Sequence, residues 1–471
     1  MIAPGASGRA LPRVSNSAVC FLALICATFL CLLPLPTVYG AAQNFNIFKN
    51  QRLPNNIQEN RPYSLQSRFD AGSQQDEGTI HFPDHNVRLS ALKQPKSGAM
   101  QFAWSLFKTT ILPQEGNAVI CPILPQTLLA SLYDAADNSA KYELRSSLMA
   151  SSQDLQPLIR DQLMAANGSS VNTFDYAMAY FLGADAVISK DIHDKALQDG
   201  VSFQQVNFLN RNEAAATANR WVTEKTRGTI REIVAPNALD SSTRLLMASV
   251  IYFKGKWKYQ FTKTDMGLFE PSTDKASSHQ VPMMYQFNKF RYGEKTFSDG
   301  NGMRWIELPY EGSKTLSMIL MLPMVRHQLQ RSAEQLTVED VSDILAGLKQ
   351  PRTFLKVHLS VPRFSVFSSS TLVPALKSMG LRSIFERSSA LSGLSNEQLV
   401  VRDVTQRTFV TIDEQGTTAS SAASLSFVAL SAAPPLPTIN FTVNEPFLLM
   451  IVDKTHEYPM FVAKVTSPET H

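Results

Sequence analysis

Cysteine is scarce in this chain, in which four cysteines occur among 471 residues. Cys20, Cys26 and Cys31 lie in an apolar segment near the N-terminus, so only Cys121 is left if that segment is removed. A single cysteine cannot form an intramolecular disulfide, and stability must come from burial of apolar side chains. The 44% hydrophobic fraction is sufficient for a sizeable core. Cys121 stands in the apolar stretch NAVICPIL, which favours a buried, inert thiol over a reactive one.

Catalytic motifs and blocks of basic charge are also missing. The patterns G-x-S-x-G, H-E-x-x-H, G-x-G-x-x-G and the P-loop do not occur, so no motif indicates an enzyme. The net charge of +4 and the lack of a Lys/Arg block argue against binding of nucleic acid. His81 and His85 have a spacing that suits a metal, but no third strong ligand accompanies them. We therefore expect no enzymatic activity, no metal and no cofactor.

A long hydrophobic run occurs once, at the N-terminus. Arg9 and Arg13 precede the apolar residues 18–35, which end in PLPTVYGAA. A short basic region, an apolar stretch and small residues at a break are typical of a secretory signal peptide, here residues 1–40 with cleavage after Gly40. The alternative is a single membrane anchor, for which the run is short. The sequence thus predicts a secreted, extracellular protein without a membrane-embedded part.

The rest of the chain divides into a polar extension and one domain. Residues 41–95 are rich in Gln, Asn, Arg, Asp and Ser and lack apolar periodicity, which predicts a disordered extension. Residues 96–471 contain no linker and no internal repeat, and they mix helical and strand-like segments without regular alternation. This pattern favours one α+β domain with extensive antiparallel sheet. We expect helices in residues 100–112, 125–148, 212–228 and 370–380, and strands in residues 245–257, 303–323, 352–366, 406–413, 447–454 and 458–465.

One long internal segment has no charge at all. Between Glu414 and Glu445 no charged side chain occurs, and the segment begins as a series of Thr, Ala and Ser. If residues 417–425 were extended, both faces of the strand would be small or apolar, and no proline precedes Pro434. Such a strand can enter a sheet without burying an unpaired charge, a property that a permanently exposed loop does not require. Loops of this length within a domain are usually functional.

Seven stretches of the chain, in this order, resemble the serpin family of serine protease inhibitors over residues 96–471: NRWVTEKTRGTI, IYFKGKWKYQF, VPMMY, IELPYEGSKTLSMILMLP, VPRFSVFSSSTLVPALKSMGLRSIF, VTIDEQGTTASSAAS and NFTVNEPFLLMIV. The resemblance implies an α+β serpin fold of three β-sheets with eight to nine helices and an exposed reactive-centre loop. It also implies that a protease cleaves this loop, forms an acyl-enzyme and is trapped when the loop inserts into the central sheet; serpin loop insertion is itself a known example of strand addition. The extension and the signal peptide are similar to insect haemolymph serpins of the Necrotic type, which implies restraint of an extracellular, innate-immune protease cascade of the Toll type.

Residue by residue, the resemblance assigns a hinge and a scissile bond. The family's spacing places the cleaved bond at Leu430–Ser431, with cleavage one or two residues away or after Phe427 as alternatives. Because a trypsin-like pocket requires Arg or Lys, Leu430 predicts inhibition of chymotrypsin-like or elastase-like proteases. Thr418 departs from the usual Glu, at a position that faces outward. The hinge and the inserting segment comprise Glu414, Gln415, Gly416, Thr417, Thr418, Ala419, Ser420, Ser421, Ala422 and Ala423.

Positions that hold the family's central sheet closed are changed here. In place of the usual Ser, Asn and His, the chain has Cys121, Ser249 and Gln406, and the Gln406 amide offers both donors and an acceptor. Trp257 matches the tryptophan near the top of that sheet. Glu445 replaces the basic or polar residue that usually precedes the PF pair. The three changes therefore predict a re-formed hydrogen-bond network at this point of the sheet.

The sequons at Asn167 and Asn440 are candidate glycosylation sites, and Asn167 is the better one because Asn440 adjoins a strand.

As partner we expect an extracellular serine protease, held covalently by a monomeric inhibitor. The alternative is a non-inhibitory serpin that acts as a carrier or chaperone. Bulky, charged or proline residues at 417–423 would favour that alternative, and none is present.

Overall fold

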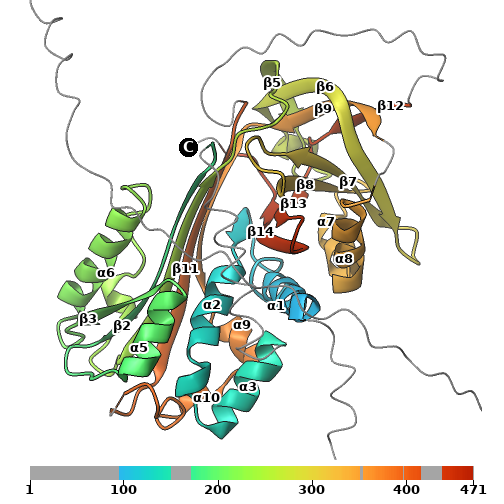
Figure 1. Cartoon of the computed structure of the whole chain (residues 1–471). Coiled ribbons are helices and arrows are strands. Elements are labelled where there is room, and N and C mark those ends of the chain that lie inside the picture. The colour runs from blue at the N-terminus through green and yellow to red at the C-terminus, as the bar shows by residue number, and fades with distance from the viewer. Residues whose placement is uncertain (1–94, 150–170, 351–353, 396, 415–436, 470–471) are drawn as a thin grey trace, which may run out of the picture. The chain divides into compact units, whose positions relative to one another are not determined.

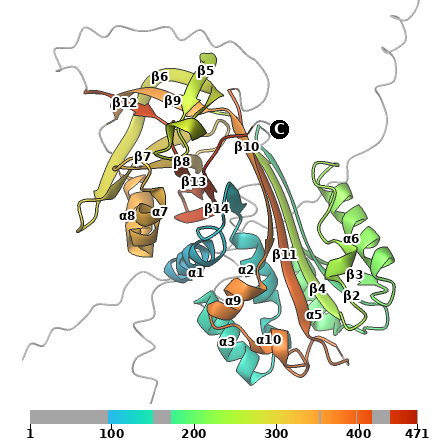
Figure 2. The same cartoon turned by 180° about the vertical axis from the view of Figure 1, so that it is seen from behind.

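The structure is a computed structural model, and it describes residues 95–149, 171–350, 354–395, 397–414 and 437–469. These residues form nine α-helices and fourteen β-strands (Figures 1 and 2). The α+β class and the expected number of helices are therefore confirmed for this part of the chain. The helices are α1 (Pro95–Thr110), α2 (Ile123–Ser131), α3 (Asn138–Leu148), α5 (Lys190–Gln198), α6 (Arg211–Lys225), α7 (Leu329–Gln335), α8 (Val338–Gly347), α9 (Val373–Ser378) and α10 (Ser383–Glu386).

The smaller sheet has five strands in the order β10-β11-β4-β2-β3. Both parallel and antiparallel pairs occur on either side of its central pair: β10 is antiparallel to β11, β2 is antiparallel to β4, and β3 is parallel to β2. At its centre β11 and β4 run parallel over almost their whole length. The five strands are β2 (Thr173–Gly183), β3 (Val201–Val206), β4 (Leu245–Lys254), β10 (Phe364–Thr371) and β11 (Val401–Ile412).

The larger sheet has nine strands, in the order β1-β14-β13-β8-β7-β6-β9-β12 with β5 also paired to β6. The long β6 joins two groups, because residues 279–290 pair with β5 and β9 whereas residues 291–296 pair with β7. The three sheets that the resemblance implied are thus seen among the described residues as two continuous sheets. The strands are β1 (Ala118–Ile120), β5 (Lys263–Phe269), β6 (His279–Thr296), β7 (Gly302–Pro309), β8 (Leu316–Pro323), β9 (Leu355–Pro362), β12 (Thr438–Thr442), β13 (Phe447–Asp453) and β14 (Tyr458–Val465).

The five-stranded sheet is covered by the main core on one face and in part by α6 on the other. Successive side chains of a strand point to opposite faces, and in β4 Met247 and Ile251 belong to the main core whereas Ala248 and Val250 belong to a second apolar cluster. Helix α2 contacts β2 and β4 on the first face, and α6 contacts β2 and β3 at the second. Figures 1 and 2 show the two helices on opposite sides of this sheet. A strand that entered the sheet beside β11 would therefore be buried on the face of the main core and only partly covered on the other, where Arg407 and Phe409 of β11 are half-buried.

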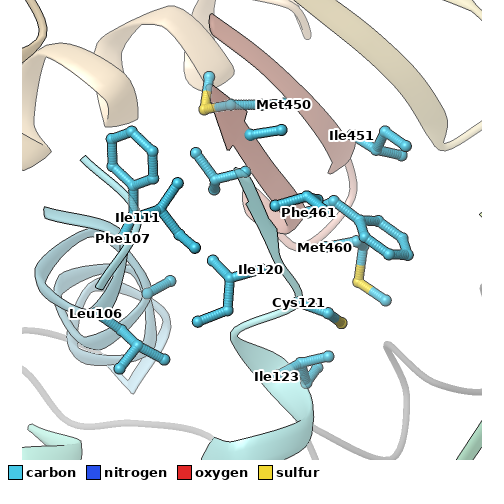
Figure 3. Close-up of a cluster of buried hydrophobic side chains, with 14 of the residues drawn as sticks. Leu106, Phe107, Ile111, Ile120, Cys121, Ile123, Met450, Ile451, Met460 and Phe461 are labelled. Carbon is cyan, nitrogen blue, oxygen red and sulfur yellow. The ribbon is translucent and has the colours of Figure 1, made fainter. Parts of the chain in front are cut away.

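The main core joins the first helix to the C-terminal strands. Figure 3 shows Phe107 of α1 and Ile111, which directly follows this helix, in one cluster with Ile120, Met450 and Phe461. All five side chains are fully buried. The hairpin of β13 and β14 is therefore part of the same core as the N-terminal helix, and its burial contributes to the stability of the whole sheet.

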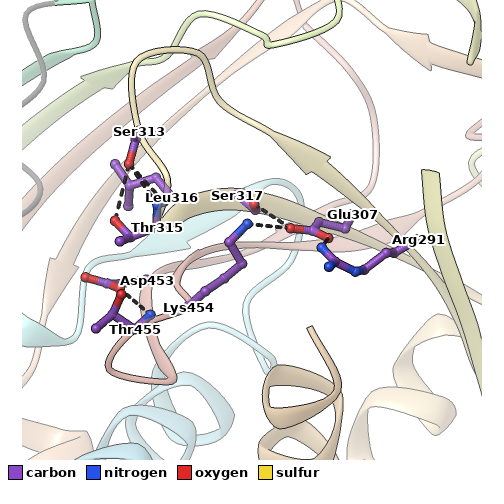
Figure 4. A network of polar contacts seen from close by, with 9 residues as sticks. All are labelled: Arg291, Glu307, Ser313, Thr315, Leu316, Ser317, Asp453, Lys454 and Thr455. Atoms are coloured by element: carbon purple, nitrogen blue, oxygen red, sulfur yellow. Dashed lines mark hydrogen bonds and ion pairs between the residues drawn. The ribbon is translucent and has the colours of Figure 1, made fainter. Parts of the chain in front are cut away.

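A buried ionic network connects the middle strands of the larger sheet (Figure 4). The carboxylate of Glu307 on β7 accepts hydrogen bonds from Arg291 Nη1 at 2.8 Å, Ser317 Oγ at 2.7 Å and Lys454 Nζ at 2.9 Å. Burial acts to raise the pKa of Glu307, but the bonds from Lys454 and Arg291 outweigh it, so that this pKa lies below the usual glutamate value. The charge is thereby satisfied inside the sheet, as a buried carboxylate must be.

Two of the expected elements differ from the observed ones. The helix expected over residues 125–148 is interrupted, because Asp137 caps a new helix by accepting a hydrogen bond from the Ala140 N–H. The single strand expected over residues 352–366 is in fact β9 and β10, which lie in different sheets. The break falls at Pro362 and Arg363. At this point the Arg363 N–H donates a hydrogen bond to the carbonyl oxygen of Pro282.

The described residues contain neither a membrane-spanning helix nor a cluster of metal ligands. None of the helices among them is both long and apolar enough to cross a membrane. The same residues hold no group of three or more His, Cys, Asp or Glu side chains placed to bind a metal ion.

Candidate functional site: the central seam and the ends of the loop

The candidate site begins where β11 ends. Lys254 Nζ forms an ion pair with Asp413 Oδ2 at 2.8 Å, and Trp257 Nε1 donates to the carbonyl oxygen of Asp413 at 2.8 Å. The indole of Trp257 also stacks on Tyr310, with ring centroids 4.7 Å apart and an interplanar angle of 12°. Trp257 thus packs in the core and in addition binds the backbone just before the hinge.

Glu414, the first residue of the predicted hinge, is bound by two separate segments, residues 261–264 and Arg363. Its Oε1 accepts hydrogen bonds from Thr264 Oγ1 at 2.8 Å and from Arg363 Nη1 at 3.3 Å. Its carbonyl oxygen accepts the N–H of Phe261 at 3.3 Å. The chain therefore leaves the sheet from a fixed point, and the uncharged segment starts directly after it.

The boundary between the neighbouring strands β4 and β11, here called the seam, is the place where an inserting strand would enter the sheet. The two strands are parallel, and Gln406 on β11 lies directly opposite Ser249 on β4. A chain that turned back after β11 would run antiparallel to β11, and for the same reason antiparallel to β4. Entry of one strand would separate the two neighbours by about another 4.8 Å, the spacing of strands in a sheet.

On the face of the main core, Gln406 holds this seam closed. Its Oε1 accepts from the Cys121 N–H at 2.8 Å and from Thr408 Oγ1 at 3.1 Å. Its Nε2 donates to Cys121 O at 3.0 Å and to Ser249 Oγ at 3.2 Å. The structure thus brings together all three residues that replace the family's Ser, Asn and His, with the glutamine amide at the centre.

Cys121 takes part in this network through its backbone only. Its thiol lies among apolar side chains such as Ile123 and Met460 (Figure 3). Burial raises the pKa of the Cys121 thiol far above its ordinary value. The thiol is thus neutral and inert, in agreement with the interpretation of its apolar sequence.

The opposite face of the seam carries a second connection, which the sequence did not reveal. Arg407, the neighbour of Gln406, points to the α6 side and donates from Nε to the carbonyl oxygen of Glu232 at 3.1 Å. The segment around Glu232 is fixed to α6, because Asn219 Oδ1 accepts the N–H of Ile233 at 2.8 Å. Arg407 therefore connects β11 to α6 and the segment that follows it, whose apolar residues cover β2 and β4. No motif marks this contact, because the acceptor is a backbone oxygen.

The chain returns from the uncharged segment at β12. The carbonyl oxygen of Pro437 accepts the N–H of Lys356 at 3.2 Å, and β12 then pairs in parallel with β9. Asn440 is exposed on this strand, so its sequon is accessible although it lies within a β-strand. The two ends of the loop are thus held by different sheets.

Glu445, the unusual residue before the PF pair, is buried behind this return point. Its Oε2 accepts the N–H of His327 at 2.7 Å, and its Oε1 lies 3.6 Å from Arg326 Nε. Arg326 also forms an ion pair with Glu270 at 2.6 Å. The acidic residue therefore has its own local partners, which explains how the fold accommodates it.

Several predicted site residues lie outside the described residues. They are the signal peptide 1–40, the extension 41–94, the sequon at Asn167, the hinge and insertion residues from Gln415 to Ala423, and the scissile pair Leu430 and Ser431.

Comparison with known proteins agrees with this architecture. The family model described as "Serpin (serine protease inhibitor)" matches residues 97–468. Human leukocyte elastase inhibitor is 33% identical over 278 residues, which are 57% of this chain and 70% of that protein. Sheep antithrombin-III is 32% identical over 276 residues, 57% of each chain, and antichymotrypsin-2 of Bombyx mori is 27% identical over 383 residues, 76% of this chain and 94% of that one. The crystal structure of Serpin48 from the insect Tenebrio molitor superimposes with a TM-score of 0.68 at 23% identity, covering 83% of this chain and 100% of that one.

The fold, the parallel seam and the family match are consistent with one another, and the family is described as one of protease inhibitors and not of enzymes. The chain belongs to the serpin family of serine protease inhibitors.

Proposed function

We propose that this protein is an inhibitory serpin and a suicide substrate of chymotrypsin-like or elastase-like serine proteases. The protease serine attacks the carbonyl carbon of Leu430, the amine of Ser431 leaves, and an acyl-enzyme ester remains on Leu430. The freed segment from Thr417 to about Phe427 then enters the sheet between β4 and β11. The observation that supports this most is the parallel pairing of β4 and β11, with β11 running directly into the hinge at Glu414.

The composition of the loop supports insertion over the carrier alternative. The site that would receive it faces the main core on one side and is partly covered on the other, where Phe409 packs against the α6 cluster. A charged residue buried there would lack a partner and would oppose insertion by several kcal/mol. The absence of charge from Gln415 to Asn444 meets this requirement along the whole segment.

The choice of protease rests on Leu430 and on the absence of Arg and Lys from the loop. Relatives of this chain carry names that refer to elastase and to chymotrypsin, namely human leukocyte elastase inhibitor and silkworm antichymotrypsin-2. Both names fit a target that cleaves after a large apolar or a small side chain and not after a basic one.

We further propose that the protein is secreted as a monomer and restrains an extracellular protease cascade of the innate immune, Toll type, as a serpin of the Necrotic type. Support comes from the signal-peptide pattern of residues 1–40, from the sequons at Asn167 and Asn440, and from the likeness in fold to insect serpins.

Incubation of the purified protein with chymotrypsin, elastase and trypsin tests the central part of this proposal. We expect an SDS-stable complex with chymotrypsin or elastase, and a released C-terminal peptide whose first residue is Ser431 by N-terminal sequencing. Complete cleavage without a complex would favour the carrier alternative. A complex with trypsin alone would contradict the assignment of Leu430.

A further inference from the structure

The sheet next to the loop's return point carries an exposed face that the inhibitory mechanism does not use. It is formed by two cross-strand pairs of β6 and β9, Phe287 opposite His358 and Lys289 opposite Lys356, and by Phe354, which precedes β9 and lies beneath the guanidinium of Arg291. Because alternate residues of a strand share one face, Phe287, Lys289 and Arg291 of β6 lie on the same side of the sheet as His358 and Lys356 of β9, and Phe354 joins them through its contact with Arg291. We refer to these six residues as the β6–β9 face.

The central pair of this face is electrostatically unusual. Lys289 and Lys356 lie directly opposite each other, an arrangement in which like charges destabilise a sheet. Neither lysine forms an ion pair within 4.0 Å among the described residues. The adjacent reactive loop contains no acidic side chain that could neutralise them, since residues 415–444 are uncharged. Two unneutralised ammonium groups side by side indicate a surface suited to an anionic partner.

The flanking pairs add exposed aromatic area. Phe287 is 53% exposed and stacks on His358 with ring centroids 4.3 Å apart, and Phe354 is 43% exposed beneath the Arg291 guanidinium at 5.1 Å. Exposed aromatic side chains held in place by neighbours, together with arginine, are typical of protein–protein interfaces. The mixture of few charges and ordered aromatic rings favours a protein partner over a polysaccharide, which would require a longer basic track.

The position of the face identifies which protein would cover it. The Lys356 N–H binds the carbonyl oxygen of Pro437, and Thr438, the first residue of β12, pairs with Lys356 itself. The side chains of the face thus stand one strand away from the point where the loop returns to the fold, and β6, β9 and β12 lie together at one end of the molecule in Figures 1 and 2. A protease engaged on the loop would lie beside this face.

We infer that the β6–β9 face is a secondary binding surface for the target protease, and that the target carries acidic residues beside its active-site cleft. The inference rests on the proposed inhibitory function and adds a determinant of specificity outside the loop. Charge complementarity at a surface of this kind raises the association rate, whereas cleavage and insertion depend on the loop and the seam. The face therefore changes how fast the correct protease is captured, and it leaves the fraction of captures that end in inhibition unchanged.

The test compares two double charge reversals. Lys289→Glu with Lys356→Glu inverts the face, and Arg220→Glu with Lys225→Glu places the same change of net charge on exposed positions of α6, which packs on the other sheet. The probes are chymotrypsin and chymotrypsin treated with succinic anhydride, which converts its surface ammonium groups into carboxylates. Each protease is normalised by its activity on a small uncharged substrate. Protein made in bacteria carries no N-linked glycan, so that Asn440, opposite His358, does not cover the face.

We expect the wild-type protein to capture succinylated chymotrypsin about tenfold faster than the untreated protease at low ionic strength, as electrostatic steering predicts, and this advantage to disappear in high salt. The reversal on the face should abolish the advantage and leave the stoichiometry of inhibition unchanged. The variant with the charge reversal on α6 should retain most of the faster capture of succinylated chymotrypsin.

Equal association rates for wild type and the face variant, with covalent complexes forming normally, would overturn the inference and leave the proposed function intact. Equal losses in both variants would also overturn it, because net charge and not the face would then steer the encounter. Heparin that binds the wild type and not the face variant, while the rates with both proteases are equal, would assign the face to a polysaccharide. If the wild type forms no complex with any serine protease, the proposed function and this inference both fail.

Discussion

Gln406 is the residue on which the closed state of the sheet depends most directly, because its single amide makes four hydrogen bonds at the seam. Replacing it by leucine removes the partners of the buried Cys121 N–H and C=O while keeping a side chain of similar volume. An unsatisfied buried polar group costs about 1–3 kcal/mol, so we expect Gln406→Leu to lower the stability of the intact protein by that amount. Urea unfolding measures the effect, and Gln330→Leu on the surface of α7 serves as a control that should change stability little.

Thr417 and Thr418 differ only in the face on which they would insert. The family's pattern places Thr417 inward and Thr418 outward, so an arginine at 417 would bury a charge and an arginine at 418 would not. We predict that Thr417→Arg is cleaved as a substrate without forming a complex, and that Thr418→Arg still inhibits. Gel analysis after incubation with chymotrypsin separates the two results. Normal inhibition by Thr417→Arg would refute insertion of this segment.

The pKa of Glu307 predicts a loss of stability in acid. This pKa is lower in the folded protein than in the unfolded chain, so the folded state favours the charged carboxylate. Its contribution is therefore complete above the unfolded pKa of about 4.3 and is lost as the pH falls through the folded value. Glu307→Gln should destabilise the protein at neutral pH and should flatten the dependence of unfolding free energy on pH in the acid range. An unchanged acid profile would mean that other carboxylates determine it.

At the scale of elements, α6 and the segment after it move with β2 and β4 if the sheet opens, whereas Arg407 moves with β11. The bond of 3.1 Å between Arg407 and Glu232 O must then break, because one inserted strand adds about 4.8 Å between the halves. We predict that Arg407→Met destabilises the intact form, accelerates insertion and leaves the loop-cleaved form unaffected. Chemical denaturation of both forms checks this, with the exposed Arg382→Met as control. Equal destabilisation of intact and cleaved forms would show a general structural role instead.

The elements that could be predicted from the sequence are those with local signals. The helix α6 ends near Gly228 as expected, since Gly228 adopts a positive φ of 82°. Strands β2, β3 and the 18-residue β6 were not predicted, because their exposed and buried residues do not alternate regularly; β6, for example, changes partners along its length. The split of residues 352–366 was missed for a related reason, since only tertiary pairing assigns β9 and β10 to different sheets.

At the scale of the whole molecule, the sequence indicated an inhibitor with an insertable loop, but it did not indicate which contacts keep the central sheet closed. The hinge and the uncharged segment are contiguous in the chain, so their pattern can be recognised directly. Gln406 and Cys121, in contrast, are 285 residues apart, and Arg407 and Glu232 are 175 apart. Contacts between residues so far apart in the chain, in which one partner is a backbone group, produce no local pattern that can be recognised in a single sequence.

The central claim is that the seam between β4 and β11 accepts the loop as a new strand. The most direct measurement compares the thermal unfolding of the intact protein with that of protein cleaved once in the loop, near Leu430. An added central strand supplies two ladders of hydrogen bonds and buries its inward-facing side chains, so the account predicts that cleavage raises the unfolding temperature by tens of degrees. An unchanged or lower unfolding temperature after cleavage would contradict it.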